Sequence, residues 1–397
     1  MTSIAIGLAV IAAWSTPAGA QSKQPGDDQR VRVETRNERR IVISREIIEE
    51  IRRVIDTAVG EVRAREIGRE IGRQFQDVAG DVSREIARAR IAASSAIQNR
   101  DFKIEQTDRQ TKTLAIGAAG ELLLKNVAGD ITVKAGGGRE ATVEIVRVSR
   151  GRTDADAKLG LERVTAEVSV RGERGSVIAQ YSDDRRPNYS VSVAYTVTTP
   201  AGTRLTVDTI AGQVRVAGLQ GELHVGGVSG AVEISSCSRA ASVKTIAGGI
   251  TLTDVQSPGH LEVGSVSSTI RLTGIKAQRL TVSLVSGAIV AREIQADAAA
   301  LDTTSGGIEY SGSLSARGRY EFRAFSGNVR LGLTGGFDLE MKTFSGRVEA
   351  DPSLGLTPTL KAGAQSQRSL QGVAGNGGAA VVASTFSGNV WVGRKLN

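Results

Sequence analysis

The sequence predicts an all-β fold, a single-stranded parallel β-solenoid of about nine to ten rungs, preceded by an amphipathic α-helical segment. The first observation is a short phrase that recurs nine times after residue 209: an apolar residue, Ser or Ala, usually Gly, any residue, then Val or Ile. The second is its interval, which stays at about 18 to 21 residues until a last gap of about twice that length. A fixed period of this length is typical of a solenoid.

The third observation is the position of the apolar residues inside each repeat. Counted from the Ser or Ala as zero, they recur at −6, −4, −1, +3 and +5, as in Leu223, Val225, Val228, Val232 and Ile234. Alternation with a period of two indicates two short strands, and the Gly between them allows a corner with positive φ. A β-propeller needs a longer period, and a sandwich has no reason to keep one.

Stacked rungs place equivalent residues above one another. We therefore expect one column of Leu223, Leu261 and Leu280, and a second column of Val232, Ile250, Ile270 and Ile289. Antiparallel hairpins would instead put these side chains on opposite faces.

The first 43 residues indicate export. Residues 1–20 contain an apolar run followed by Ala18, Gly19 and Ala20, which predicts a signal peptide cleaved before Gln21. The alternative is an uncleaved anchor, although the run is too short to span a bilayer. Residues 21–43 form a polar spacer, and the predicted location is the periplasm, outer envelope or cell surface.

Residues 44–100 form a charged amphipathic segment with helical periodicity. Its apolar positions recur every three to four residues, at Ile47, Ile51, Val54, Ala58, Val62, Ile67, Ile71, Phe75, Val78, Val82 and Ile86. Gly60, Gly68, Gly72 and Gly80 favour two or three helical pieces over one long helix. A coiled-coil stalk, a membrane-surface helix and a linker all remain open.

Residues 112–204 contain an opening rung and a β insertion that acts as a cap. The rung runs from Leu122 to Val133. Strand-like runs follow at 141–148, 164–170, 176–181 and 189–198, with one short helix predicted at 153–162. We expect these strands to cover the N-terminal end of the solenoid, because an exposed edge invites association.

Residues 205–397 carry the serial repeats, with an insertion at about 351–384. Phe325, Phe344 and Phe386 occupy position −1 of their repeats, where earlier repeats have Ile or Val. That position predicts that the three rings stack inside the solenoid. An exposed aromatic strip that binds sugar is the competing interpretation.

The order of these sequence motifs resembles that of a known family. The run from Leu122 to Val133, the run from Tyr195 to Val207 and the serial Ser-Gly-x-Val repeats resemble the bacterial putative-adhesin family of β-strand-repeat domains of unknown function, over about residues 112–397. The resemblance implies a β-solenoid at the envelope or surface and no catalytic residues. Ser268, which stands where a Gly is expected, departs from the pattern.

The charge pattern suggests anionic partners. The net charge is +8, and Arg outnumbers Lys by 39 to 11. For an exported protein this favours acidic polysaccharide or a lipid surface, or a protein partner for the helical segment, and not nucleic acid. The candidate polyanion contacts are Arg215, Arg271, Arg330, Arg52, Arg53, Arg69 and Arg73. The oligomeric state is not predicted.

No catalytic, cofactor or metal site is predicted. His224 and His260 lie too far apart to share a metal ion, and the repeated Ser residues have no His within reach. Cys237 is alone and is predicted to be a partly buried structural residue. Carboxylates that could serve a polysaccharide-cleaving enzyme are Glu233, Glu262, Glu309 and Glu349, but an alternating charge row explains most of them.

These observations favour a non-catalytic exported scaffold or adhesin-like binding module. One alternative is a polysaccharide-active β-helix enzyme. Another is an envelope-stress or signalling accessory protein whose helical segment recruits a partner.

Overall fold

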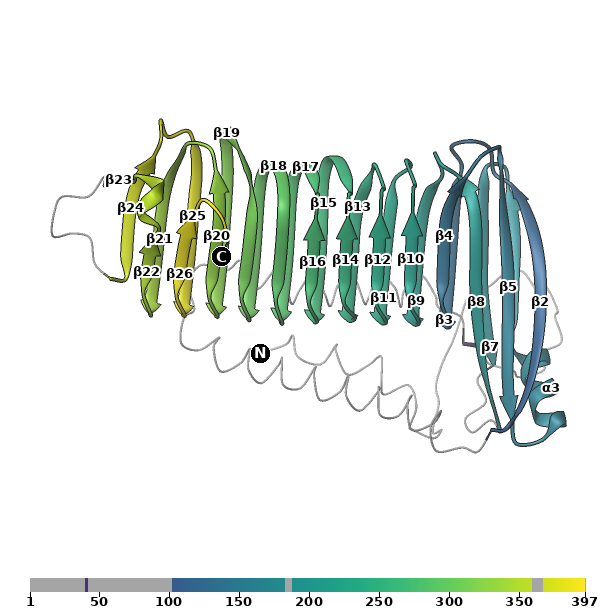
Figure 1. Cartoon of the computed structure of the whole chain (residues 1–397). Coiled ribbons are helices and arrows are strands. Elements are labelled where there is room, and N and C mark those ends of the chain that lie inside the picture. Colours follow the sequence, from purple (N-terminus) through teal and green to yellow (C-terminus); the bar gives the residue numbers. More distant parts are fainter. Residues whose placement is uncertain (1–39, 42–101, 183–187, 359–366, 397) are drawn as a thin grey trace, which may run out of the picture.

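A computed structural model describes residues 40–41, 102–182, 188–358 and 367–396. Over these ranges the chain is all-β, with one short α-helix and one 3-10 turn, and its strands stack along a single axis (Figure 1). The prediction of an all-β repeat fold is confirmed. The predicted signal peptide, nearly all of the polar spacer and the helical segment lie outside the described residues.

Each rung contributes one strand to a first face and, after the corner glycine, one strand to a second face. The first-face strands are β3 (Glu121–Ala128), β9 (Arg204–Ala211), β11 (Leu223–Ser229), β13 (Ala240–Ala247), β15 (Gln256–Ser267) and β17 (Lys276–Ser286). The second-face strands are β4 (Ile131–Gly136), β10 (Val214–Ala217), β12 (Val232–Ser235), β14 (Ile250–Thr253), β16 (Ile270–Thr273) and β20 (Val329–Thr334). Two long strands, β18 (Ile289–Ser305) and β19 (Ile308–Ser326), begin on the second face and end on the first.

Successive rungs pair in parallel, so the predicted columns can be checked directly. On the second face Val232 aligns with Ile250, Ile250 with Ile270 and Ile270 with Ile289, which confirms that column. On the first face Leu261 aligns with Leu280. Leu223 aligns with Leu205 and, at a register shift, with Ala240, so alanine interrupts the leucine column at β13.

The N-terminal end is a cap of longer strands, and here the sheet becomes mixed. In it, β7 (Arg174–Ser182) and β8 (Tyr189–Pro200) extend the two faces in parallel beside β3 and β4. Antiparallel pairs follow, formed by β6 (Thr165–Arg171), β5 (Glu140–Gly151), β2 (Ile104–Ala115) and β1 (Arg40–Ile41). The predicted strand runs fall in β5, β6, β7 and β8, and the predicted helix is α3 (Asp154–Arg163).

The helix α3 is held at both ends by side chains. Thr153 is its N-cap and forms a capping box with Asp156. Arg147 donates hydrogen bonds to the carbonyl oxygens of Leu161 and Val164 at the other end, at 2.8 and 2.7 Å. The same guanidinium binds Asp108 at 2.6 Å, so one largely buried arginine joins the helix to β2 and β5.

This contact makes the cap sensitive to acid. The hydrogen bond and charge of Arg147 lower the pKa of Asp108 below its ordinary value of 3.8. A carboxyl whose pKa is depressed by folding stabilises the fold above the unfolded pKa, and that stabilisation is lost as pH falls through the folded pKa. We expect Asp108→Asn to lower the melting temperature at pH 7, with the difference from the native chain shrinking below about pH 3. A difference that stays constant from pH 7 to 2 would contradict this account.

The C-terminal end departs from the expected order of rungs. Its elements are β21 (Phe337–Ser345), β22 (Val348–Ala350), the 3-10 turn η3 (Pro352–Leu354), β23 (Thr357–Pro358), β24 (Ser369–Ala374), β25 (Ala379–Ser387) and β26 (Val390–Gly393). The last rung, β25 and β26, does not follow the preceding one at the end of the stack. It lies between the β19–β20 rung and the β21–β22 rung, where β26 is visible between β20 and β22 (Figure 1). The outer edge of β21 is then covered by the antiparallel strand β24.

The corners between the two faces explain the repeated Gly. Gly212, Gly230, Gly287, Gly306 and Gly388 have φ between +128° and +148°, a region that favours glycine. Several of their backbone amides donate to the carbonyl oxygen of the corner Ser in the neighbouring rung, as from Gly287 to Ser305 at 2.8 Å. Ser268, which replaces the glycine at one corner, does not have a positive φ.

An inward row of polar side chains, at position −2, lies beside these corners. Thr343 donates to the carbonyl oxygen of Gly388 and Thr385 to that of Gly327, each at 2.9 Å. Thr245 donates to Gly248 at 2.9 Å, and Asn126 donates to Gly129 at 3.0 Å. The row satisfies corner carbonyls that the apolar interior could not.

Candidate groove and surface sites

A third side closes each rung between the second face and the next first-face strand. Short parallel pairings define it: Gln256 aligns with Lys276, Lys276 with Gln295, and Gln295 with Ser313. The turn into this side has positive φ at Ser236, Asp254 and Glu293, a strained conformation for residues other than glycine.

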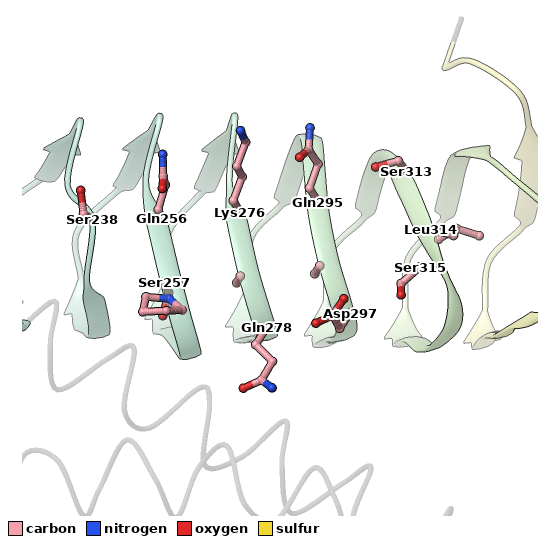
Figure 2. Close-up of a pocket in the computed structure, with 13 residues that line it drawn as sticks. Ser238, Gln256, Ser257, Lys276, Gln278, Gln295, Asp297, Ser313, Leu314 and Ser315 are labelled. Carbon is pink, nitrogen blue, oxygen red and sulfur yellow. The ribbon is translucent and has the colours of Figure 1, made fainter.

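An open groove of about 600 Å³ runs along the third side across several rungs. Gln256, Lys276 and Gln295 project from successive strands along one edge of the groove (Figure 2). Gln278 and Asp297 lie on its other border (Figure 2). Ala277 and Ala296 also line the groove. The groove therefore presents amide groups and one ammonium group at intervals of one rung, about 4.8 Å.

The second face carries a row of mixed charge at position +4. Arg215 lies beside Glu233 with 3.2 Å between Nε and Oε2. Further along, Glu309 forms ion pairs with Arg292 at 3.5 Å and with Arg330 at 3.6 Å. Opposite charges on neighbouring rungs thus neutralise each other, and at this exposure each pair contributes little to stability.

The structure places three of the predicted polyanion contacts on this row, Arg215, Arg271 and Arg330, but does not bring them together. Arg215 and Arg330 are ion-paired, and the guanidinium of Arg330 also lies 5.9 Å from the ring centroid of Trp391. Arg271 is exposed and lies two rungs from Glu233. The remaining candidates, Arg52, Arg53, Arg69 and Arg73, lie outside the described residues.

The candidate catalytic carboxylates are likewise dispersed. Glu233 and Glu309 belong to the ion pairs of the second face, and Glu349 lies on β22 of the same face. Glu262 projects from the first face, where it pairs with Lys244 at 3.2 Å. These carboxylates do not form a facing pair of the kind that glycoside hydrolysis uses.

The other reactive side chains take structural positions. His224 bonds to Glu222 and His260 to Thr281, each at 2.9 Å. Ser286, Ser305, Ser326 and Ser345 are exposed beside the corners, as expected for a repeated corner residue. Cys237 is buried, which confirms that prediction, and burial raises the pKa of its thiol.

The three repeat phenylalanines correct a prediction. Phe344, Phe386 and Phe325 do not stack in the interior of the rungs; they are exposed by 65%, 39% and 38% on the first face. We call them the aromatic ladder. The rings of Phe344 and Phe386 have centroids 4.7 Å apart and an interplanar angle of 5°, and those of Phe386 and Phe325 are 5.0 Å apart at 2°.

The parity of the strand explains the error. Side chains at positions −6 and −4 point inward, as those of Leu223 and Val225 do, and the polar row at −2 points the same way. Alternation along the strand therefore places position −1 on the outward side. Counting the parity across the strand locates both the aromatic ladder and the inward polar row, neither of which follows from apolar character alone. From the sequence, position −1 is predicted to point inward because it carries apolar residues in most repeats.

The described part of the chain gives two negative findings. No group of three or more His, Cys, Asp or Glu side chains in it is placed to hold a metal ion. None of its helices is both long and apolar enough to cross a membrane.

Comparison with known proteins gives one family and several solved structures. The model of the family described as Toastrack DUF4097 matches residues 119–393. A putative lipid binding protein from Parabacteroides distasonis ATCC 8503 shares 13% sequence identity with this chain, with a TM-score of 0.39 over 71% of this chain and 96% of that one. A putative adhesin from Bacteroides fragilis NCTC 9343 shares 11%, with a TM-score of 0.35 over 72% and 97%.

A putative cell adhesion protein from Clostridium sporogenes ATCC 15579 shares 9% identity, with a TM-score of 0.27 over 72% of this chain and 99% of that one. No curated protein matches the chain.

Proposed function

Because the chain belongs to the Toastrack DUF4097 family, we propose that it is a non-catalytic binding module of the cell envelope, built as a parallel β-solenoid, that holds acidic polysaccharide along its third side. Family membership confirms the resemblance to adhesin-type β-repeat domains seen in the sequence. Export through the predicted signal peptide is part of the proposal, as is an envelope or surface location. The observation that carries the proposal is the groove with its row of Gln256, Lys276 and Gln295.

The groove suits an extended polymer better than a compact ligand. It is open along the axis, and each of three successive rungs contributes one long polar side chain to its edge. Amide groups can donate to and accept from sugar hydroxyls, while the ammonium of Lys276 can bind a carboxylate or sulfate. Several weak contacts on one linear chain add up, because the later contacts form at high effective concentration.

The charge of the whole chain supports the choice of an acidic polymer. A net charge of +8 attracts polyanions at long range, although exposed charges are screened beyond about 8 Å at physiological salt. Arg215, Arg271 and Arg330 of the second face remain proposed polyanion contacts, secondary to the groove because two of them already have acidic neighbours.

We expect the double variant Lys276→Gln and Gln295→Ala to bind polygalacturonate roughly tenfold more weakly than the native chain, because one charge-assisted contact and one neutral hydrogen bond are lost. Binding of the native chain should also weaken as salt is raised from about 0.05 to 0.5 M. Isothermal titration calorimetry of the purified protein measures both effects.

The matched control is Arg215→Gln with Arg271→Gln, which changes the charge on the second face and leaves the groove intact. It should reduce binding about twofold or less. If the control loses binding while the groove variant binds as the native chain does, the polysaccharide lies on the second face and the groove proposal is wrong. If no acidic polysaccharide binds the native chain, the proposal as a whole is wrong.

A further inference from the structure

The aromatic ladder is an apolar surface that the groove proposal does not use. Six large hydrophobic side chains of the described residues are exposed, and three of them form this one ladder. Single exposed apolar residues are ordinary, whereas a contiguous group of them marks a site of interaction. The ladder lies near the C-terminal end of the stack, on β19, β25 and β21.

The ladder is a local feature of its row. Moving along the first face from Phe325 toward the N-terminal cap, position −1 is occupied by Thr304, Val285 and Val266. Phenylalanine therefore appears only in the three adjacent rungs at one end. These three rungs are adjacent in space although they are not consecutive in the sequence, because β25 lies between β19 and β21.

The geometry of the rings determines which ligands fit. Both faces of Phe386 are occupied, by Phe344 on one side and Phe325 on the other. A sugar ring stacks on the open face of an aromatic ring, so Phe386 offers no platform for it. The ladder thus presents the edge of Phe386 together with the exposed surfaces of the end rings, Phe344 and Phe325, each of which is stacked on Phe386 through one face. This continuous apolar ridge suits an aliphatic environment.

The charge around the ladder favours an anionic partner. The stretch of sequence that contains all three rings, residues 319–397, has nine Lys and Arg against five Asp and Glu, a net charge of +4 summed over all its faces. Arg323 and Lys342 stand in the adjacent outward row, where each is ion-paired but still about half exposed. Arg347 is exposed at the corner that follows Phe344.

We propose that the aromatic ladder and the basic side chains beside it bind the surface of an anionic lipid membrane. The ring edges enter the boundary between headgroups and acyl chains, where aromatic side chains are favoured, and the cations meet the lipid phosphates. This site lies on a different face from the groove, so the two proposals can be tested independently. Together they describe a scaffold that contacts a membrane near one end and holds a polymer along its side.

The area of the ladder argues against a second copy of the chain as the occupant. A stable interface buries about 800 Å² on each partner, while a whole Phe side chain offers at most about 250 Å² and these three are already partly buried. Insertion into a lipid surface needs no such area, because a few apolar side chains and several cations act together.

The experiment is co-sedimentation of the full chain with vesicles made of equal parts phosphatidylglycerol and phosphatidylcholine. We expect the native chain to bind these vesicles and to bind phosphatidylcholine vesicles weakly. Phe344→Ser with Phe386→Ser should reduce binding by roughly tenfold or more, because two inserted apolar groups are lost. The matched control, Phe344→Leu with Phe386→Leu, keeps an apolar ridge and should bind within about threefold of the native chain.

Several results separate this proposal from its rivals. The Ser variants should melt close to the native temperature and keep their binding to polygalacturonate, since the ladder is exposed and remote from the groove. Unchanged binding of the Ser variants to anionic vesicles overturns the proposal. If the native chain elutes as a dimer that the Ser variants dissociate, with vesicle binding unaffected, the ladder is an interface between two copies and the lipid proposal is wrong.

Discussion

Gly306→Ala is expected to destabilise the stack by about 3 kcal/mol or more, whereas the same change at the adjacent Gly307 should alter stability by less than about 1 kcal/mol. Gly306 has φ +139°, which is unfavourable for alanine, and a Cβ placed on it would overlap the carbonyl oxygen of Gly287 in the preceding rung. That oxygen belongs to backbone shared with the neighbouring corner, so it cannot move without disturbing a second rung.

Gly307 is a close internal control because it differs by one position in the same corner. A Cβ placed there would lie 3.4 Å from the carbonyl oxygen of Asn328, an ordinary contact, and its φ is not in the left-handed region. Urea denaturation monitored by circular dichroism measures both variants, with the m-value showing whether the transition remains comparable. Equal stability of the two variants would mean that the corner relaxes freely, contrary to the stacked geometry.

Phe322→Ala is expected to cost about 3–5 kcal/mol, whereas Phe344→Ala should cost less than about 1 kcal/mol. Phe322 is fully buried and packs against Tyr310 with ring centroids 4.8 Å apart. Its removal leaves a cavity that the parallel backbones above and below cannot close. Phe344 is 65% exposed, so its truncation loses one stacking partner and little burial.

The comparison of Phe322 and Phe344 tests the parity of the first face. Phe322 is at position −4 and Phe344 at position −1, and the two side chains are equally apolar. Thermal and urea denaturation of the two single variants would decide between an inward and an outward position −1. A loss of several kcal/mol for Phe344→Ala would show that its ring is enclosed and would remove the basis of the lipid proposal.

Much of the architecture can be predicted from the sequence because the repeat is local. The spacing of Val232, Ile250, Ile270 and Ile289 predicts one column, and the parallel register confirms it. The corner glycines are predictable in the same way, since only glycine is comfortable at their φ. The short helix predicted at 153–162 from its polar stretch is α3, at 154–163.

The groove could not be predicted, because it is made by residues that have no repeated pattern. The row consists of two uncharged amides, Gln256 and Gln295, and one ammonium group, Lys276. These residues occupy the variable part of each repeat, so no sequence motif marks them. Only the stacking of three rungs brings them into one row. The same limit applies to Arg147, whose contacts with Asp108 and the end of α3 connect elements that are far apart in the chain.

The sequence by itself determined the rung: its two strands, its glycine corner and the apolar residues that fill it, because these depend on contacts that return with every period. The tertiary structure decided how the rungs are ordered and which surfaces they expose. The last rung lies between two earlier ones because parallel backbone pairing is nearly the same for any pair of rungs, so chain order alone does not fix the neighbour. That intercalation places Phe386 between Phe325 and Phe344 and thereby completes the aromatic ladder.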